Sequence, residues 1–163
     1  NKCRLKIIRR IMKIKWLIID GHNLMHKHLE ITGSLNNNHE KARTDLIRFI
    51  EKVTPSISKK VTVVFDGKKL GDDPFLSSKF VEVIYAPSEL TADGLIERLV
   101  TQHSSPESIL VITSDHLEQQ TVSSSGAQFQ SAEDFLMNNV NNNTNYSTKM
   151  RPSEKPKLGD FFP

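Results

Sequence analysis

The sequence predicts an α/β fold in which helices cover both faces of a central, mainly parallel sheet. Several short apolar segments show no alternation of apolar and polar residues, and this pattern is typical of strands buried on both faces. Segments of helical periodicity separate most of these strands along the chain. Alternating strands and helices favour parallel strands joined by right-handed crossovers. We therefore expect three layers, with ligands bound beyond the carboxyl ends of the strands.

The first expected strand is KWLII (15–19), which is brief and uniformly apolar. Residues 32–39 (TGSLNNNH) are polar and rich in turn-forming residues, so they predict a loop. Apolar residues recur at helical spacing between residues 40 and 53, and Pro55 follows the expected end of this helix.

The middle of the chain predicts two more strands and a second helix. VTVVF (61–65) and FVEVIY (80–85) are the strands, and the polar residues 67–79 form a loop between them. Apolar positions at helical spacing predict a helix over 91–102, with the hydroxyl of Thr91 as its N-cap.

The remaining elements alternate in the same way. SILVIT (108–113) predicts a fourth strand, residues 116–122 a short helix, and residues 127–130 a short fifth strand. Ser131 begins a last helix, and Ser131 with Asp134 resembles a capping box with Asp in place of Glu or Gln.

Charge is distributed unevenly along the 163 residues. The formal net charge of +3 combines +5 in residues 1–11 and +2 in residues 141–163 with −4 in residues 12–140. We expect one domain over 12–140, a basic N-terminal extension or binding arm before it, and a polar, disordered C-terminal tail. Met12 resembles a start site just before the first strand. The basic excess indicates nucleic-acid binding only weakly, because it lies in the two tails.

Composition excludes several classes of protein. The chain has one cysteine, so it forms neither an internal disulfide framework nor a four-cysteine zinc site. No apolar run approaches the roughly 20 residues that a membrane span needs, and the N-terminus lacks the apolar core of a secretory signal. We therefore expect a cytoplasmic protein with no membrane partner. The sequence contains no P-loop and no dinucleotide-binding glycine motif.

Acidic residues follow the strands at their carboxyl ends. Asp20, Asp66 and Asp115 come directly after or one residue beyond three strands, and Asp93 lies in the first turn of the helix after another. Because the carboxyl ends of parallel strands share one edge of a sheet, these acids should converge there. Converging carboxylates repel one another, and a hard divalent cation such as Mg²⁺ or Mn²⁺ relieves the repulsion. Such ions hydrolyse phosphodiesters by activating water.

Two further residues extend this expected site, and a purely structural interpretation stays open beside it. Glu97 lies one helical turn after Asp93 on the same face, and Asn23 follows the first strand closely enough to reach the same edge. Asp after a strand is also a common turn residue. Asp93 and Asp115 would equally stabilise helix N-termini.

Other candidates carry supporting roles. Thr113 and Ser114 are expected either to hold a water or phosphate or to cap a helix. Lys68 and Lys69 follow Asp66 and would contact the nucleic-acid backbone, or form a solvated loop. His22 is more plausible as a contact to RNA phosphate than as a ligand of a transition metal.

Several segments together resemble the YacP-like NYN domain family of PIN-like nucleases. The resemblance covers most of the chain, from about residue 15 to residue 140, in the family's order and spacing. It is carried by LIIDGHN (17–23), VTVVFDG (61–67), VEVIYA with ELTADGLIERLV (81–100), VITSDHLEQQTVSSSGA (111–127) and SAEDFL (131–136).

The resemblance implies a three-layer PIN-like fold and a Mg²⁺- or Mn²⁺-dependent endoribonuclease. The family's acidic positions match Asp20, Asp66, Asp93 and Asp115, which it assigns as catalytic metal ligands; Asn23 lies in the first motif, and Glu97 matches the acid after TAD. The family also implies RNA as partner, with a link to mRNA turnover on ribosomes. Two departures concern substrate choice: the first motif is DGHN, with His22 in place of the usual aromatic, and the segment after EQ is more polar.

The sequence therefore predicts a metal-dependent endoribonuclease. One alternative is a non-catalytic RNA- or ribosome-binding module on the same fold, against which the presence of all four acids argues. Another is a metal-dependent phosphatase or DNA nuclease, whose site would look similar.

Overall fold

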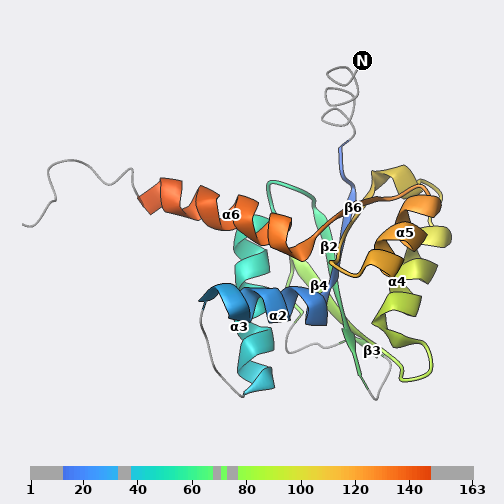
Figure 1. The fold of residues 1–163 in the computed structure, drawn as a ribbon, viewed down its shortest axis with the longest axis horizontal. Coiled ribbons are helices and arrows are strands. Elements are labelled where there is room, and N and C mark those ends of the chain that lie inside the picture. The colour runs from blue at the N-terminus through green and yellow to red at the C-terminus, as the bar shows by residue number, and fades with distance from the viewer. Residues whose placement is uncertain (1–12, 33–37, 68–70, 73–76, 148–163) are drawn as a thin grey trace, which may run out of the picture.

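A computed structural model describes residues 13–32, 38–67, 71–72 and 77–147. Within these residues, six strands form one sheet in the order β3-β4-β2-β1-β5-β6 (Figure 1). The strands are β1 (Trp16–Asp20), β2 (Lys60–Asp66), β3 (Gly71–Asp72), β4 (Val81–Ala86), β5 (Ile109–Ile112) and β6 (Gln128–Gln130). All neighbouring pairs are parallel except β3 with β4. The predicted mainly parallel sheet is confirmed.

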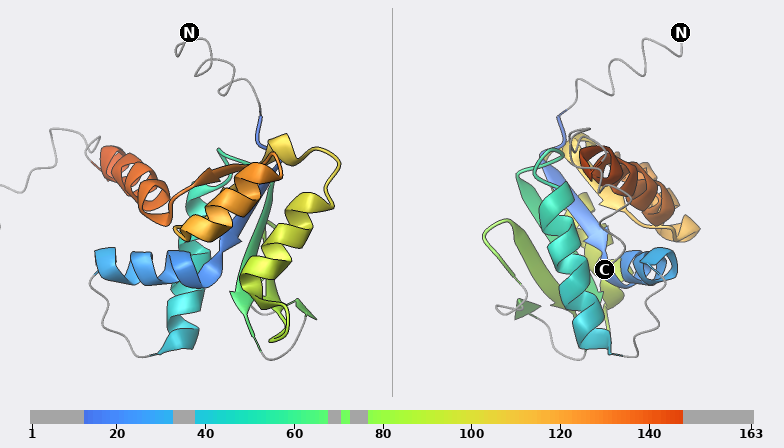
Figure 2. Two further views of the ribbon diagram at one scale, coloured as in Figure 1. Left: turned by 45° about the vertical axis from the view of Figure 1, so that its right-hand side comes forward. Right: turned by 90° about the vertical axis from the view of Figure 1, so that its left-hand side faces the viewer.

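Helices cover both faces of this sheet, as Figure 2 shows. The helices are α2 (Gly21–Thr32), α3 (His39–Val53), α4 (Thr91–Thr101), α5 (His116–Ser124), α6 (Ala132–Ser147) and the short 3₁₀ helix η1 (Pro106–Ser108). Helices α2, α3 and α6 bury their apolar side chains in the core on one face, and α4 and α5 bury theirs on the other. The three-layer α/β/α architecture is therefore confirmed.

Strand β1 shows how one segment supplies both cores. Leu17 and Ile19 point to the α2, α3 and α6 face, whereas Trp16 and Ile18 point to the α4 and α5 face. All of β1 is buried, because successive side chains of a central parallel strand face opposite layers, both of which are covered. This explains the uniformly apolar sequence that predicted the strand.

Three elements differ from the expectation. Helix α2 was not predicted, because its apolar side is narrow: Leu24 and Met25 are buried, but three histidines interrupt the pattern. The expected loop over 67–79 contains the two-residue strand β3. Helix α6 continues to Ser147, beyond Val140, where the sequence predicted its end.

Some predictions concern residues outside the described part of the chain. The N-terminal extension (1–11) lies there, as do residues 148–163 of the predicted C-terminal tail. Among the helices that the structure describes, none is long and apolar enough to cross a membrane.

Candidate metal centre

The centre of the site is Asp20, the last residue of β1. Strand β1 lies between β2 and β5, so its carboxyl end lies in the middle of the sheet edge. Asp20 is buried, with 7% of its surface exposed. Its Oδ1 accepts a hydrogen bond of 3.3 Å from the backbone N–H of Asn23 in the first turn of α2. The β1–α2 junction therefore fixes this carboxylate at the sheet edge.

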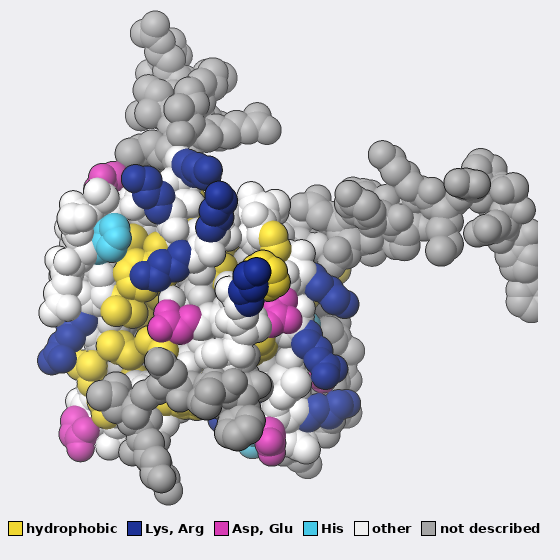
Figure 3. Space-filling view, turned by 180° about the vertical axis from the view of Figure 1, so that it is seen from behind, with side chains coloured by type: hydrophobic (Ala, Val, Ile, Leu, Met, Phe, Trp, Pro, Cys, Tyr) yellow, Lys and Arg dark blue, Asp and Glu magenta, His cyan; other side chains and the backbone are white. Residues whose placement is uncertain are grey.

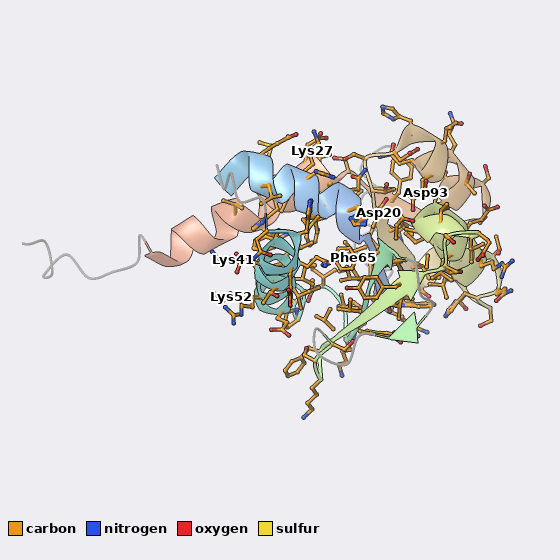
Figure 4. All side chains as sticks on the ribbon, turned by 90° about the horizontal axis from the view of Figure 1, so that it is seen from below. Asp20, Lys27, Lys41, Lys52, Phe65 and Asp93 are labelled. Atoms are coloured by element: carbon orange, nitrogen blue, oxygen red, sulfur yellow. The ribbon has the colours of Figure 1, made fainter. Side chains whose placement is uncertain are left out.

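Two further carboxylates, from the helical layer formed by α4 and α5, lie next to Asp20. Asp93 comes from the first turn of α4 and Glu118 from the first turn of α5. Carboxylate oxygens of Asp20, Asp93 and Glu118 all lie within 4.8 Å of one another. Figure 4 shows Asp20 and Asp93 next to each other at this edge. We refer to these three residues as the acidic triad. On the face seen in Figure 3, by contrast, acidic side chains are scattered singly.

Glu118 is the most constrained member of the triad. Its side chain is 6% exposed, and its Oε2 accepts a hydrogen bond of 2.7 Å from the hydroxyl of Thr113. Among the described residues, its buried Oε1 has no hydrogen-bond partner. The pKa of Glu118 is raised to about 9. Burial contributes most, the negative charges of Asp20 and Asp93 and a side-chain hydrogen bond with Asp20 add to the rise, and the Thr113 hydrogen bond opposes it.

The other two carboxylates respond to the same crowding. The pKa of Asp20 is raised to about 6. Burial contributes most, the charges of Asp93 and Asp66 add to the rise, and hydrogen bonds with the Asn23 N–H and with Glu118 oppose it. The pKa of Asp93 is also raised, mainly by partial desolvation and then by the charges of Asp115 and Asp66, while a hydrogen bond with Glu118 opposes the rise. Without a cation, the triad therefore holds a proton near neutral pH.

The triad has the ligand chemistry of a hard divalent cation. It offers only carboxylate oxygens, which Mg²⁺ and Mn²⁺ prefer, and no thiolate or imidazole that would favour a softer metal. When Glu118 is ionised, its buried Oε1 has no hydrogen-bond donor among the described residues, and a structure normally satisfies such an atom. A cation between the three carboxylates would bind this oxygen and cancel their repulsion. The residues present therefore fit such an ion.

Asp66 and Asp115, two of the four predicted ligands, border the triad and make hydrogen bonds at helix N-termini. Asp66 Oδ1 accepts a 2.7 Å hydrogen bond from the backbone N–H of Ala92 in α4. Asp115 is the N-cap of α5, and its Oδ1 accepts from the N–H groups of Leu117 (2.9 Å) and Glu118 (3.1 Å). Each thereby anchors the helix that carries a triad residue. A direct role for either in metal binding stays a prediction.

Asn23, Thr113 and Ser114 connect the elements that meet at the site. Asn23 Oδ1 accepts a 2.9 Å hydrogen bond from the Ser114 N–H, which ties α2 to the end of β5. Ser114 Oγ accepts a 3.0 Å hydrogen bond from the N–H of Ala132 at the start of α6. Thr113, fully buried, donates to Glu118 and accepts from the Asp115 N–H at 3.2 Å. These contacts position the acids.

The remaining predicted residues lie around this centre. Glu97 is exposed on α4 and lines a hollow of about 130 Å³ together with Asp93 and Glu118. His22 packs edge-on against Phe65, with ring centroids 5.4 Å apart, and burial lowers its pKa. The imidazole therefore favours its neutral form. Lys68 and Lys69 lie outside the described residues.

Glu118 was missing from the sequence-based site. The EQ pair at 118–119 contributed to the family resemblance, but an acid within a predicted helix indicates a solvated face as readily as a buried one. The signal that could have identified it is its position three residues after Asp115. The first turn of a helix that begins at the carboxyl edge of a parallel strand lies against that edge.

Comparison with known proteins agrees with this geometry. The family model described as "YacP-like NYN domain" matches residues 17–160. The chain belongs to this family. Protein YacP of Bacillus subtilis (strain 168) is 31% identical over 122 residues, which span 74% of this chain and 72% of YacP.

Two crystal structures of Rae1 (YacP) from Bacillus subtilis have the same fold. One, a single-residue variant, gives a TM-score of 0.64 at 29% identity and covers 88% of this chain and 87% of that one. The other gives 0.65 at 27% identity and covers 84% and 80%. The structural similarity therefore covers most of this chain.

Proposed function

We propose that this protein is a metal-dependent endoribonuclease that hydrolyses RNA phosphodiester bonds. The observation that supports this most directly is the acidic triad, in which carboxylate oxygens of Asp20, Asp93 and Glu118 lie within 4.8 Å of one another. Membership in the YacP-like NYN family favours a nuclease. Among RNA substrates, the family resemblance favours mRNA, including mRNA on ribosomes. The cytoplasmic location that the sequence predicts is part of this proposal.

In this proposal the residues of the chain have distinct tasks. Asp20, Asp93 and Glu118 would hold Mg²⁺ or Mn²⁺, which supplies a water of lowered pKa and stabilises charge on the phosphate. Asp20 and Glu118 are buried, so the bound ion would be shielded from bulk solvent on the side of the sheet. Thr113 keeps Glu118 Oε2 in place. Asp66 and Asp115 hold the N-termini of α4 and α5.

The decisive experiment compares the parent chain with two matched variants. Asp93→Asn removes a triad charge at nearly constant volume, and Glu107→Gln makes the same type of change on an exposed side chain in η1, just before β5 at the amino ends of the strands. Labelled single-stranded RNA is incubated with each protein in Mg²⁺, Mn²⁺ or EDTA, with and without purified ribosomes. We expect cleavage by the parent and the Glu107→Gln variant in metal, and none in EDTA.

The cleavage rate of Asp93→Asn should be at least about 100-fold lower than that of the parent. Replacing a residue that only supports a metal ligand typically costs less than this. Equal cleavage by Asp93→Asn and parent would indicate a contaminating nuclease. RNA binding without cleavage in any metal would favour the non-catalytic binding module. Parallel reactions with single-stranded DNA and with a phosphomonoester test the DNA nuclease and phosphatase alternatives.

A further inference from the structure

We propose that the groove between α5 and β6 binds a nucleobase of the RNA substrate next to the cleaved bond. This inference rests on the proposed nuclease function and deepens it. The groove has a volume of about 560 Å³, within the range of ordinary small-molecule sites. Its lining consists of His116, Gln119, Gln120, Ser123, Ser124 and Phe129. Figure 2 shows α5 and β6 next to each other.

The chemistry of this lining matches a base better than a phosphate. It contains amides, hydroxyls, an imidazole and an aromatic ring, but no carboxylate, lysine or arginine. Phosphate binding draws mainly on lysine, arginine and helix N-termini. Bases of single-stranded RNA are instead bound by aromatic stacking and by hydrogen bonds to their edges. The groove offers both of these and little positive charge.

Phe129 is the stacking surface in this proposal. It lies at the centre of β6, the edge strand of the sheet, and 44% of its surface is exposed. A second hollow, lined in part by Ser123 and Gln128, adjoins the same ring. Phe129 thus lines both hollows. An exposed phenylalanine that borders two hollows is available for stacking, and each base stacked on an aromatic ring contributes appreciably to affinity.

The polar side chains of the groove have unused hydrogen-bonding capacity. Among the described residues, the side chains of Gln120 and His116 have no hydrogen-bond partner. The Nε2 of Gln119 donates to the backbone carbonyl of Thr113 at 2.8 Å. This bond fixes the orientation of the Gln119 amide and leaves its carbonyl oxygen as an acceptor. A fixed amide beside a free one can discriminate between bases by their donor and acceptor patterns.

The groove lies close to the acidic triad through a shared helix. Helix α5 carries Glu118 on the side that faces Asp20, and Gln119 and Gln120 follow it directly, turned to another side of the helix. The two sides are therefore within about 10 Å, the diameter of a helix. A base in the groove would belong to a nucleotide near the cleaved bond and would set preference for its identity.

A peptide strand added to the edge of β6 is the main competing occupant. Strand addition depends on a row of backbone hydrogen bonds, and β6 has only three residues before α6 begins at Ala132. Such a short edge offers few backbone groups. The side chains that line the groove, in contrast, come mostly from α5, which a peptide paired with β6 would not use. The observations therefore favour RNA.

The test measures RNA affinity with a variant and a matched control. Phe129→Ala and Phe129→Trp are compared with Phe80→Ala, which removes an exposed phenylalanine just before β4 begins, at the amino ends of the strands. Binding to short fluorescent RNAs is measured by anisotropy on the full chain in Ca²⁺, and cleavage in Mg²⁺ is measured in parallel. A scan places an abasic nucleotide at each position around the cleaved bond.

We expect Phe129→Ala to weaken binding about tenfold, as loss of one base stack does, Phe129→Trp to retain it, and Phe80→Ala to leave it unchanged. One abasic position should weaken binding by the parent but not by Phe129→Ala. Gln120→Ala should flatten base preference at that position. If Phe129→Ala binds and cleaves RNA as the parent does, the groove proposal is wrong while the nuclease proposal stands. If the parent neither binds nor cleaves RNA, both are overturned.

Discussion

Replacing Glu118 by glutamine should stabilise the metal-free protein while abolishing its response to metal. Glutamine has nearly the shape of the protonated glutamate that the triad holds near neutral pH. Its carbonyl oxygen can still accept the hydrogen bond from Thr113. What the substitution removes is the need to take up a proton, or to bury a charge beside Asp20, when the chain folds.

The magnitude follows from the raised pKa. In the unfolded chain Glu118 has a pKa of 4.5 and is ionised at pH 7, whereas in the folded protein its pKa is about 9 and it is protonated. Protonation at pH 7 against a pKa of 4.5 costs about 1.4 kcal/mol for each of the 2.5 pH units, or about 3.5 kcal/mol. Glutamine avoids this cost, which corresponds to a rise in Tm of roughly 10 °C.

The pH dependence has a definite sign. Below pH 4.5 both states of the parent carry the proton, so the variant has no advantage. Between pH 4.5 and about 9 the native parent binds more protons than the unfolded chain, so its stability falls as pH rises. The advantage of Glu118→Gln should therefore grow across this window and level off above it.

The assay is urea unfolding in EDTA at several pH values between 4.5 and 9, with Glu97→Gln as the exposed control. Thermal scans with added Mn²⁺ follow. Mn²⁺ should raise the Tm of the parent by mass action and leave that of Glu118→Gln nearly unchanged. A variant no more stable than the parent at pH 8, or an advantage that does not shrink toward pH 4.5, would refute the reasoning.

Three other substitutions test the contacts around the triad. Thr113→Val leaves Glu118 Oε2 and the Asp115 N–H without their partner. The free energy of unfolding should therefore fall by about 1–3 kcal/mol and the affinity for Mn²⁺ by about 10–100-fold, as measured by urea unfolding and calorimetric titration. Thr113→Ser keeps the hydroxyl and should retain both the stability and the affinity. Asp115→Ala removes a helix cap and should lower the free energy of unfolding by about 1 kcal/mol, whereas Asp115→Asn should lower it hardly at all, as urea titration measures. If Asp115→Asn binds Mn²⁺ as tightly as the parent does, Asp115 is a helix cap alone; a large drop in Mn²⁺ affinity identifies it as a metal ligand. Gly21→Ala would place a Cβ 2.5–2.9 Å from ring atoms of Phe65, which should cost about 1–3 kcal/mol; a urea midpoint equal to that of the parent would contradict this close contact.

Much of the candidate site was predictable because parallel topology alone decides it. Asp20 ends a strand whose uniformly apolar sequence requires burial on both faces, and such a strand lies inside a parallel sheet. Asp93 begins the helix that follows another strand of the same sheet. Once the strands are parallel, their carboxyl ends lie on one edge of the sheet, so both acids are placed at that edge.

Glu118 and helix α2 were not predictable in this way. A glutamate in a short polar helix such as α5 usually faces water. It is buried here because Val122, one turn later, packs into the core on the same side and turns Glu118 toward Asp20. Helix α2 has a narrow apolar side, and it is Leu24 and Met25, packed in the core shared with α3 and α6, that hold it in place.

By itself, the sequence determined the class of fold and the edge of the sheet at which acids gather, and from these acids it predicted a hard cation. These depend on local patterns, namely apolar strands, helical periodicity and the residue that follows each strand. The tertiary structure decided which acids converge and which cap helices. Asp66 and Asp115 bond to N–H groups of α4 and α5, while Glu118 completes the triad. The physical reason is that a carboxylate at a strand end has two competing partners, a helix N-terminus and a cation, and only the docking of each helix decides between them.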